Sequence, residues 1–231
     1  TWFTFLYNEL SPINLGDCQE FRINLNMKKA DFFKSWSELH GNAKISGIVK
    51  SWLTISYLLV KPLVKLKITP NILTIFGLLF GVLLYLNALT NWAVILLTLS
   101  LICDGMDGSL AIITGKTSKW GAMLDSVADR VTEFFWALTF IAIGANKYVV
   151  IAALLIASVQ EYVRARAGGL GLSEVGVVTI AERPVRASIL FVAVIAFILN
   201  IEIVNLLAII WMIMQIFSFL TVTKFTYKKL N

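Results

Sequence analysis

Charged residues are scarce in this chain and unevenly placed. Only 15% of its 231 residues are Asp, Glu, Lys or Arg, and 58% are hydrophobic, whereas a soluble domain carries about 25% charged residues. Charge is missing from long stretches, which lie between residues 67 and 104, 133 and 147, 147 and 161, and 202 and 224. A helix that crosses a bilayer needs about 20 apolar residues. The scarcity of charge therefore excludes an ordinary soluble domain and predicts an all-α integral membrane protein with several spans.

Cysteine is also rare. Cys18 and Cys103 are too few for a disulfide framework, and we interpret Cys103 as a small buried side chain. The net charge is +6. Because the basic residues flank the apolar stretches, we attribute this charge to contact with anionic lipid and expect no nucleic-acid partner.

The apolar stretches predict six transmembrane helices within residues 69–231. Thr69 and Pro70 supply an N-cap and a first-turn proline for the first span, and Gly77 and Gly81 have the spacing of a small-residue packing face. The first, second, fourth and fifth predicted spans cover approximately residues 71–88, 92–113, 148–167 and 184–199. The third span begins near residue 120, and the sixth follows residue 202 and ends near residue 223.

Two segments precede this predicted membrane domain. Residues 44–68 place apolar side chains on one side of a helix and lysines on the other, which predicts a juxtamembrane amphipathic helix in the cytoplasmic interface, ending near Pro62. A soluble amphipathic helix packed on another domain is the alternative. Residues 1–43 are mixed and polar, and we expect an extension that is partly disordered or auxiliary.

The basic residues also predict the orientation. They gather in the N-terminal segment, in the loops after the second and fourth spans, and at the C-terminus, whereas the opposite turns hold only Lys147. The positive-inside rule then predicts a multi-pass protein of the cell membrane with both termini in the cytoplasm.

Four aspartates interrupt otherwise apolar sequence. Asp104 and Asp107 lie near the end of the second predicted span, and Asp125 and Asp129 lie near the start of the third. Spacings of three and four residues place each pair on one helix face. Clustered carboxylates repel one another unless cations neutralise them, and hard oxygen ligands favour Mg²⁺, Mn²⁺ or Ca²⁺. We therefore predict a divalent-cation site that opens toward the cytoplasm.

The spacing of these residues resembles the signature of the CDP-alcohol phosphatidyltransferase family. The signature reads Asp, two residues, Asp-Gly, two residues, Ala-Arg, eight residues, Gly, three residues, Asp, three residues, Asp. All its fixed positions but one are matched, by Asp104, Asp107, Gly108, Ala111, Gly121, Asp125 and Asp129. Ile112 stands where the family has Arg, a departure that leaves the carboxylates intact and concerns a basic contact near the substrate phosphates.

The resemblance implies a transferase that is active as a homodimer. The four aspartates would hold two Mg²⁺ or Mn²⁺ ions, which grip the pyrophosphate of a CDP-linked lipid such as CDP-diacylglycerol. Asp129 would also act as the general base on a polar alcohol, whose oxygen attacks the β-phosphorus so that CMP leaves. The residues that would bind the CDP-lipid are Asp104, Gly108, Ala111, Gly121 and Asp125.

Arginines at the cytoplasmic ends of the fourth and fifth predicted spans suggest a phosphorylated acceptor, because guanidinium groups suit phosphate. The candidate acceptor-binding residues are Arg164, Arg166, Arg183 and Arg186. Anchoring of these arginines to lipid head groups is the alternative. Their segments look like those of bacterial phosphatidylinositol-phosphate synthases, which implies an inositol phosphate acceptor. Glycerol 3-phosphate is the rival, since phosphatidylglycerophosphate synthases share the main signature.

Two other classes of protein remain open from the sequence. A cation-coupled transporter also uses membrane carboxylates, although it would more often place them in broken helices of internal repeats, and we find no repeat. A catalytically silent relative could retain the fold, but it would have little reason to keep all four aspartates.

Overall fold

The computed structural model describes residues 27–39, 45–172 and 177–231, and all the regular structure in these ranges is helical. The helices in chain order are α1 (Lys29–Leu39), α2 (Gly47–Lys65), α3 (Pro70–Leu86), α4 (Trp92–Thr114), α5 (Lys119–Ala142), α6 (Lys147–Gly169), α7 (Arg183–Ile198) and α8 (Val204–Leu230). The all-α prediction is confirmed. The rest of the predicted N-terminal extension, residues 1–26 and 40–43, lies outside the described residues.

Three of these helices are long and apolar enough to cross a membrane: α4, α6 and α8. Helices α2 and α3 qualify only as a pair, and the chain bends by 110° between them. Helices α3 and α7 are shorter, with 17 and 16 residues, and α5 carries several charged residues along its length. The apolar helices agree with an integral membrane protein, and six spans stay a prediction.

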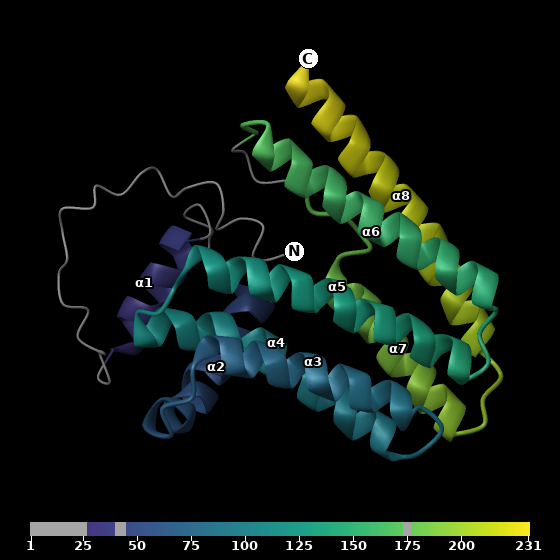
Figure 1. Ribbon diagram of the computed structural model, residues 1–231, viewed down its shortest axis with the longest axis horizontal. Coiled ribbons are helices and arrows are strands. Elements are labelled where there is room, and N and C mark those ends of the chain that lie inside the picture. The colour runs from purple at the N-terminus through teal and green to yellow at the C-terminus, as the bar shows by residue number, and fades with distance from the viewer. Residues whose placement is uncertain (1–26, 40–44, 173–176) are drawn as a thin grey trace.

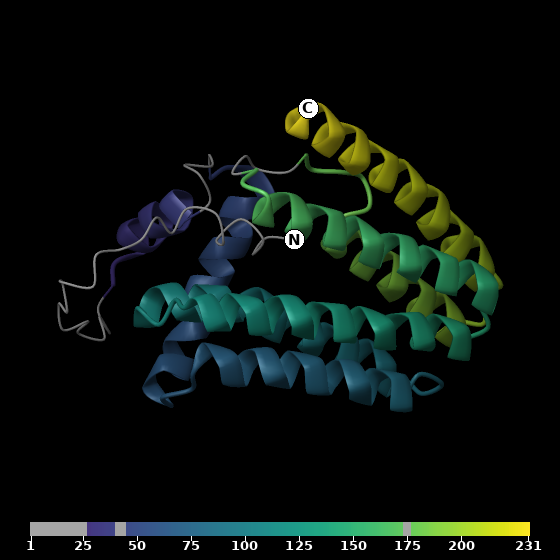
Figure 2. The same cartoon turned by 45° about the horizontal axis from the view of Figure 1, so that its top comes forward.

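The helices form two groups, which meet through α7 and through packing between α5 and α6. Helices α3, α4 and α5 pack closely side by side, and α6 packs along α8 (Figures 1 and 2). Helix α7 contacts α4, α5 and α8. A large core fills the space between these helices around residues such as Trp136, Phe140, Leu190 and Trp211.

Helix α3 approaches its neighbours closely through two glycines, as the small-residue spacing predicts. A Cβ atom on Gly81 would lie 2.9 Å from Cγ2 of Thr132 on α5, and one on Gly77 would touch Cβ of Cys103 on α4 at 3.4 Å. The Ser100 hydroxyl donates to the carbonyl of Gly77 at 2.7 Å. Because α3 fits so tightly against α4 and α5, these three helices hold the aspartates on a common framework.

Helix α2 continues one turn beyond its expected end. Pro62 lies inside the helix. It lacks an N–H group, which costs one bond to the preceding turn, but its own carbonyl accepts from the Leu66 N–H at 3.0 Å and closes the last turn. The buried face of α2 packs on α1 and α4, while apolar residues such as Leu58 and Leu59 stay exposed.

Helix α1 is an element that the sequence reasoning did not anticipate. Phe32 is fully buried, and its ring lies 5.6 Å from the ring of Tyr57 on α2. The Tyr57 hydroxyl donates to the carbonyl of Met27 at 2.7 Å. These contacts hold α1 against α2, and α1 also packs on α4, beside the end of the bundle where α4 turns into α5 (Figure 1).

Candidate active site

A cavity of about 550 Å³ lies among α1, α2, α4, α5 and α7. The helix hairpin of α4 and α5 builds its acidic wall. Gly115 ends α4 in the left-handed conformation, with φ of 63°. The Ser118 hydroxyl then caps α5 by accepting from the Gly121 N–H at 3.0 Å. This short turn reverses the chain, so the last turns of α4 face the first turns of α5.

All four predicted metal-binding aspartates line this cavity. Asp104, Asp125 and Asp129 each offer a carboxylate oxygen, and these oxygens lie within 4.8 Å of one another. Asp125 and Asp129 are buried, and Asp104 is half-buried. The structure thus brings together residues from two helices, as the spacing in the sequence predicts.

Asp107 is held in place by neighbours on two helices. The Thr74 hydroxyl of α3 donates to its Oδ2 at 2.6 Å, and the Gly108 N–H donates to its Oδ1 at 2.6 Å. Such bonds orient a carboxylate that binds a metal. The donor set is made of carboxylate oxygens alone, which is the chemistry that hard divalent cations prefer. The residues present therefore fit Mg²⁺ or Mn²⁺.

Arg183, near the start of α7, reaches directly into the aspartate cluster. Its Nη1 pairs with Asp104, and its Nη2 lies 3.0 Å from Oδ1 of Asp129. The guanidinium also lies 5.1 Å from the ring of Trp136. The sequence placed Arg183 among the candidate phosphate ligands, but it held no signal that this arginine would contact the aspartates themselves.

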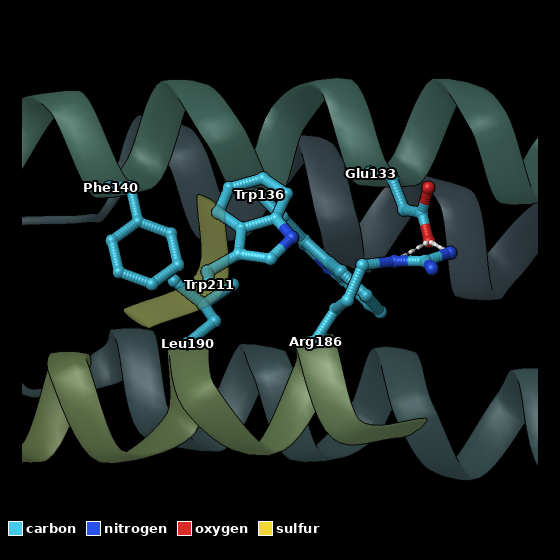
Figure 3. Close-up of a pocket in the computed structure, with 6 residues that line it drawn as sticks. All are labelled: Glu133, Trp136, Phe140, Arg186, Leu190 and Trp211. Carbon is cyan, nitrogen blue, oxygen red and sulfur yellow. Dashed lines mark hydrogen bonds and ion pairs between the residues drawn. The ribbon is translucent and has the colours of Figure 1, made fainter. Parts of the chain in front are cut away.

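Glu133 continues the aspartate face of α5 and joins several arginines. Its Oε1 accepts from Nε and Nη2 of Arg186 at 3.0 and 2.5 Å, as Figure 3 shows. Its Oε2 lies 2.8 Å from Nη1 of Arg130, and its Oε1 lies 3.9 Å from Nε of Arg183. A small cavity of about 10 Å³ adjoins this pair, lined also by Trp136 and Trp211. Arg186 is therefore held next to Arg183 by a buried ion pair rather than in the large cavity.

The other two candidate arginines lie elsewhere. Arg164 pairs with Glu182 at 2.6 Å and with Glu161 at 3.3 Å, and it also donates to the carbonyl of Val177 at 3.0 Å. Burial alone would raise the pKa of Glu182, but the hydrogen bonds and the charge of Arg164 hold it below the usual value. Arg166 is exposed. Neither arginine lines the large cavity.

The signature's small residues also divide into two groups. Gly108 lines the cavity, and so does Ile112, the residue that differs from the signature, whereas Ala111 and Gly121 do not. Ala111 is buried, and a Cβ atom on Gly121 would lie 3.0 Å from Oγ of Ser118. These two positions therefore serve the packing and capping of the hairpin in this structure.

Aromatic side chains that the sequence reasoning did not assign to the site complete the cavity wall. Trp36 of α1 and Trp52 of α2 both line it. Trp52 lies so close to Gly105 that an added Cβ would come within 2.4 Å of its Cζ2. The helical spacing of α2 did place Trp52 on its apolar side, but a single apolar face does not say whether it meets lipid, protein or ligand.

Known proteins resemble this chain over more than half of its length. Residues 67–222 match the family model described as CDP-alcohol phosphatidyltransferase. Archaetidylinositol phosphate synthase of Pyrococcus horikoshii is 40% identical over 139 residues, which cover 58% of this chain and 72% of the relative. Phosphatidylinositol phosphate synthase of Corynebacterium glutamicum is 36% identical over 160 residues, which cover 64% of this chain and 69% of the relative.

Solved structures share the fold. The phosphatidylinositol phosphate synthase of Mycobacterium tuberculosis with CDP-DAG bound superposes with a TM-score of 0.61 at 20% identity, covering 75% of this chain and 94% of that one. The same enzyme in complex with manganese and citrate gives a TM-score of 0.60, also at 20% identity, and covers 74% and 88%. With the family model matching more than half of the sequence, the chain belongs to the CDP-alcohol phosphatidyltransferases, an enzyme family.

Proposed function

We propose that this chain transfers a phosphatidyl-type group from a CDP-linked lipid to an inositol phosphate and releases CMP. The observation that carries the choice of acceptor is the position of Arg183, a buried guanidinium inside the cavity that holds the four aspartates. A free polyol offers this cation no charge to bind, whereas a phosphorylated polyol does. The relatives named archaetidylinositol phosphate synthase and phosphatidylinositol phosphate synthase support the same acceptor.

Asp104, Asp107, Asp125 and Asp129 would hold a pair of divalent ions. When bound, such ions neutralise the charge on the pyrophosphate and make CMP a better leaving group. Thr74 keeps Asp107 turned toward the site by its 2.6 Å hydrogen bond. Gly108 lines the cavity without a side chain, so it leaves room for the donor near the carboxylates.

Asp129 is the proposed general base. It lies on the α5 face that looks toward Arg183, so an acceptor whose phosphate binds Arg183 would bring its hydroxyl near the Asp129 carboxylate. Taking a proton from that hydroxyl turns a weak alcohol nucleophile into an effective one. The oxygen would then attack the β-phosphorus of the donor, and CMP would leave with the bonding electron pair.

The other arginines have supporting parts in this proposal. Arg186 stands behind Arg183, where Glu133 holds it by a 2.5 Å contact. Arg164 fixes the segment before α7 through Glu182 and Val177, and so positions the start of the helix that carries Arg183. Arg166 is exposed and suits contact with lipid head groups or the entering acceptor.

We place α3 to α8 across the membrane, which gives six spans with both termini and the site at the cytoplasmic side. The acidic residues of α5 that would argue against a span are directed inward: Asp125, Asp129 and Glu133 are buried. The outward positions of the same helix are apolar and exposed, at Met123, Val127, Val131 and Phe134. Basic residues in the α4–α5 turn and at the C-terminus support this orientation. A homodimer is proposed on family resemblance.

The test is CMP release by purified chain in lipid nanodiscs with CDP-diacylglycerol and Mg²⁺ or Mn²⁺. Parallel reactions contain inositol 1-phosphate, glycerol 3-phosphate, free inositol or no acceptor. We expect metal-dependent release with inositol 1-phosphate, and a loss of at least about 100-fold in Asp129→Asn, the size of a general-base contribution.

The parallel reactions with different acceptors distinguish the proposed acceptor from its alternatives. Release with glycerol 3-phosphate alone would replace the proposed acceptor by its rival while leaving the transferase in place. Full activity of Asp129→Asn would remove Asp129 from the role of base. No release under any condition, from folded protein that still binds CDP-diacylglycerol, would overturn the proposed acceptors.

A further inference from the structure

The wall of the large cavity includes a helix outside the region that the family model matches. That region is residues 67–222, yet Trp36 and Leu39 of α1 line the cavity together with the aspartates. Figures 1 and 2 show α1 beside the end of the bundle where α4 ends and α5 begins. A helix that the family pattern does not contain therefore reaches the substrate site.

The position of α1 is set by buried side chains. Phe32 is 0% exposed and Trp36 is 7% exposed, and both belong to a cluster with residues of α2 and α4. Lys34 and Glu38 lie on the opposite, exposed face and form an ion pair at 3.9 Å. This amphipathic division directs one face of α1 toward α2, α4 and the cavity, and the other toward water.

The cavity has two apolar ends with the carboxylates between them. Along α4 it is lined at Leu101, Asp104, Gly108 and Ile112, positions that lie on one helix face and span about 16 Å at a rise of about 1.5 Å per residue. At the Leu101 end the wall is apolar, and Leu101 and Phe191 both pack against the large core between the helices. Near Ile112 it is formed by the α1 residues and by the exposed loop residue Thr117.

A CDP-linked lipid matches this order of surfaces. Its pyrophosphate lies between a lipid moiety and a nucleoside, so metal-bound phosphates at the aspartates would direct the two moieties to opposite ends. The end near Thr117 opens at a loop, where a nucleoside can meet water, and the other end lies further along the apolar helices. On the proposed function, α1 therefore stands at the nucleoside end.

We propose that Trp36 is a donor-binding residue that stacks on the cytosine ring, with Ile112 and Leu39 forming the apolar surface around it. Flat aromatic rings bind nucleobases through their faces. The departure from the family signature fits this surface, because Ile112 packs against the same hydrophobic cluster that holds Trp36. An arginine at position 112 would put a long charged side chain in the place of this apolar contact.

The experiment measures binding of CDP to the full chain in nanodiscs with Mg²⁺, by calorimetry, for wild type, Trp36→Phe and Trp36→Leu. Phenylalanine keeps an aromatic face, whereas leucine keeps only the apolar packing. We expect Trp36→Phe to stay within about threefold of wild type and Trp36→Leu to bind CDP about 5- to 150-fold more weakly, the range for one stacked base. The KM for the phosphorylated acceptor should not change.

Lys34→Ala, on the exposed face of α1, is the matched control and should bind CDP as wild type does. The stacking role would be overturned if the wild type, Trp36→Phe and Trp36→Leu bound CDP with equal affinity. It would also be overturned if the two variants lost CDP affinity to the same extent. CMP release by the wild type is measured on the same preparation. If the wild type releases CMP and Trp36→Leu binds CDP as tightly as the wild type does, only this inference is refuted. Failure of the wild type to release CMP refutes the proposed function instead.

Discussion

Arg183 of α7 and Asp129 of α5 form an ion pair within the large cavity, with 3.0 Å between Nη2 and Oδ1. The residue proposed to bind the acceptor phosphate therefore lies against the residue proposed to take the acceptor proton. An acceptor held by this arginine needs little further guidance to reach the base, because both groups are already fixed by packed helices. Positioning of this kind accounts for a large share of the rate enhancement in enzymes that join two substrates.

Replacing Arg183 by lysine tests this pairing. Lysine keeps the positive charge but loses the planar fork that can contact two oxygens at once. We expect the KM for inositol 1-phosphate to rise roughly 10- to 100-fold, as for the loss of a charge-assisted hydrogen bond, while the KM for the CDP-lipid changes little. Steady-state kinetics with each substrate varied in turn provide the measurement. Lys147→Gln, at the first residue of α6 and so beyond the end of α5 that is far from the aspartates, is the control. An unchanged acceptor KM in Arg183→Lys would contradict the assignment.

Thr74→Val should weaken metal binding without disturbing the fold. The substitution is close in shape and removes the hydroxyl that donates to Asp107 at 2.6 Å, leaving the carboxylate free to turn. Loss of such a supporting bond costs roughly 10- to 100-fold in metal affinity or activity. Titration of Mn²⁺ followed by electron paramagnetic resonance would measure it. Thr98→Val serves for comparison, since the Thr98 hydroxyl bonds to the carbonyl of Val94 on its own helix. Equal Mn²⁺ affinity of the two variants would argue against the role of Thr74.

Glu133→Gln should destabilise the protein strongly. Glu133 is 3% exposed and neutralises Arg186, which is also 3% exposed, and removing one member of a buried ion pair typically costs about 3–5 kcal/mol. Thermal unfolding in detergent should therefore show a clearly lower midpoint. The double variant Glu133→Met, Arg186→Met removes both charges and should be more stable than Glu133→Gln. If the double variant is the less stable of the two, an unpaired buried charge is not the cause of the loss.

The ion pair of Glu182 with Arg164 should make the stability of the segment before α7 depend on pH. Its folded-state pKa is depressed because Arg164 outweighs the opposing effect of burial. A depressed carboxyl pKa stabilises the fold at pH values above the unfolded pKa, and this stabilisation is lost as the pH falls through the folded pKa. Glu182→Gln should therefore lower the free energy of unfolding by roughly 1–3 kcal/mol at pH 7, with the deficit shrinking below about pH 4. The free energy of unfolding, measured at pH 7 and below about pH 4, tests this prediction, and Glu202→Gln, at an exposed turn, is the control. A deficit of the same size at both pH values would exclude the ion pair as its source.

The predictable parts of the structure rest on local patterns. Helix ends follow caps and breaks that neighbouring residues encode: Pro70 opens α3, Ser118 caps α5 and Gly115 ends α4. The meeting of Asp104 with Asp125 and Asp129 could also be foreseen, because a hairpin of two helices joined by a short turn leaves few ways to arrange its facing residues. The helix α1 was missed because its position depends on contacts with α2 and α4. The extra turn of α2 was missed because Pro62 suggested the helix end, although a proline removes only one backbone hydrogen bond and its own carbonyl still accepts from Leu66.

The sequence by itself determined the class of protein, the helices and the carboxylates of the site, because hydrophobicity, helical periodicity and fixed short spacings act between near neighbours in the chain. Only the tertiary structure decided that Arg183 would reach Asp104 and Asp129, that Glu133 would hold Arg186, and that Trp36 would line the cavity. These contacts join α1, α4, α5 and α7. They depend on how whole helices pack, so no spacing in the sequence could reveal them.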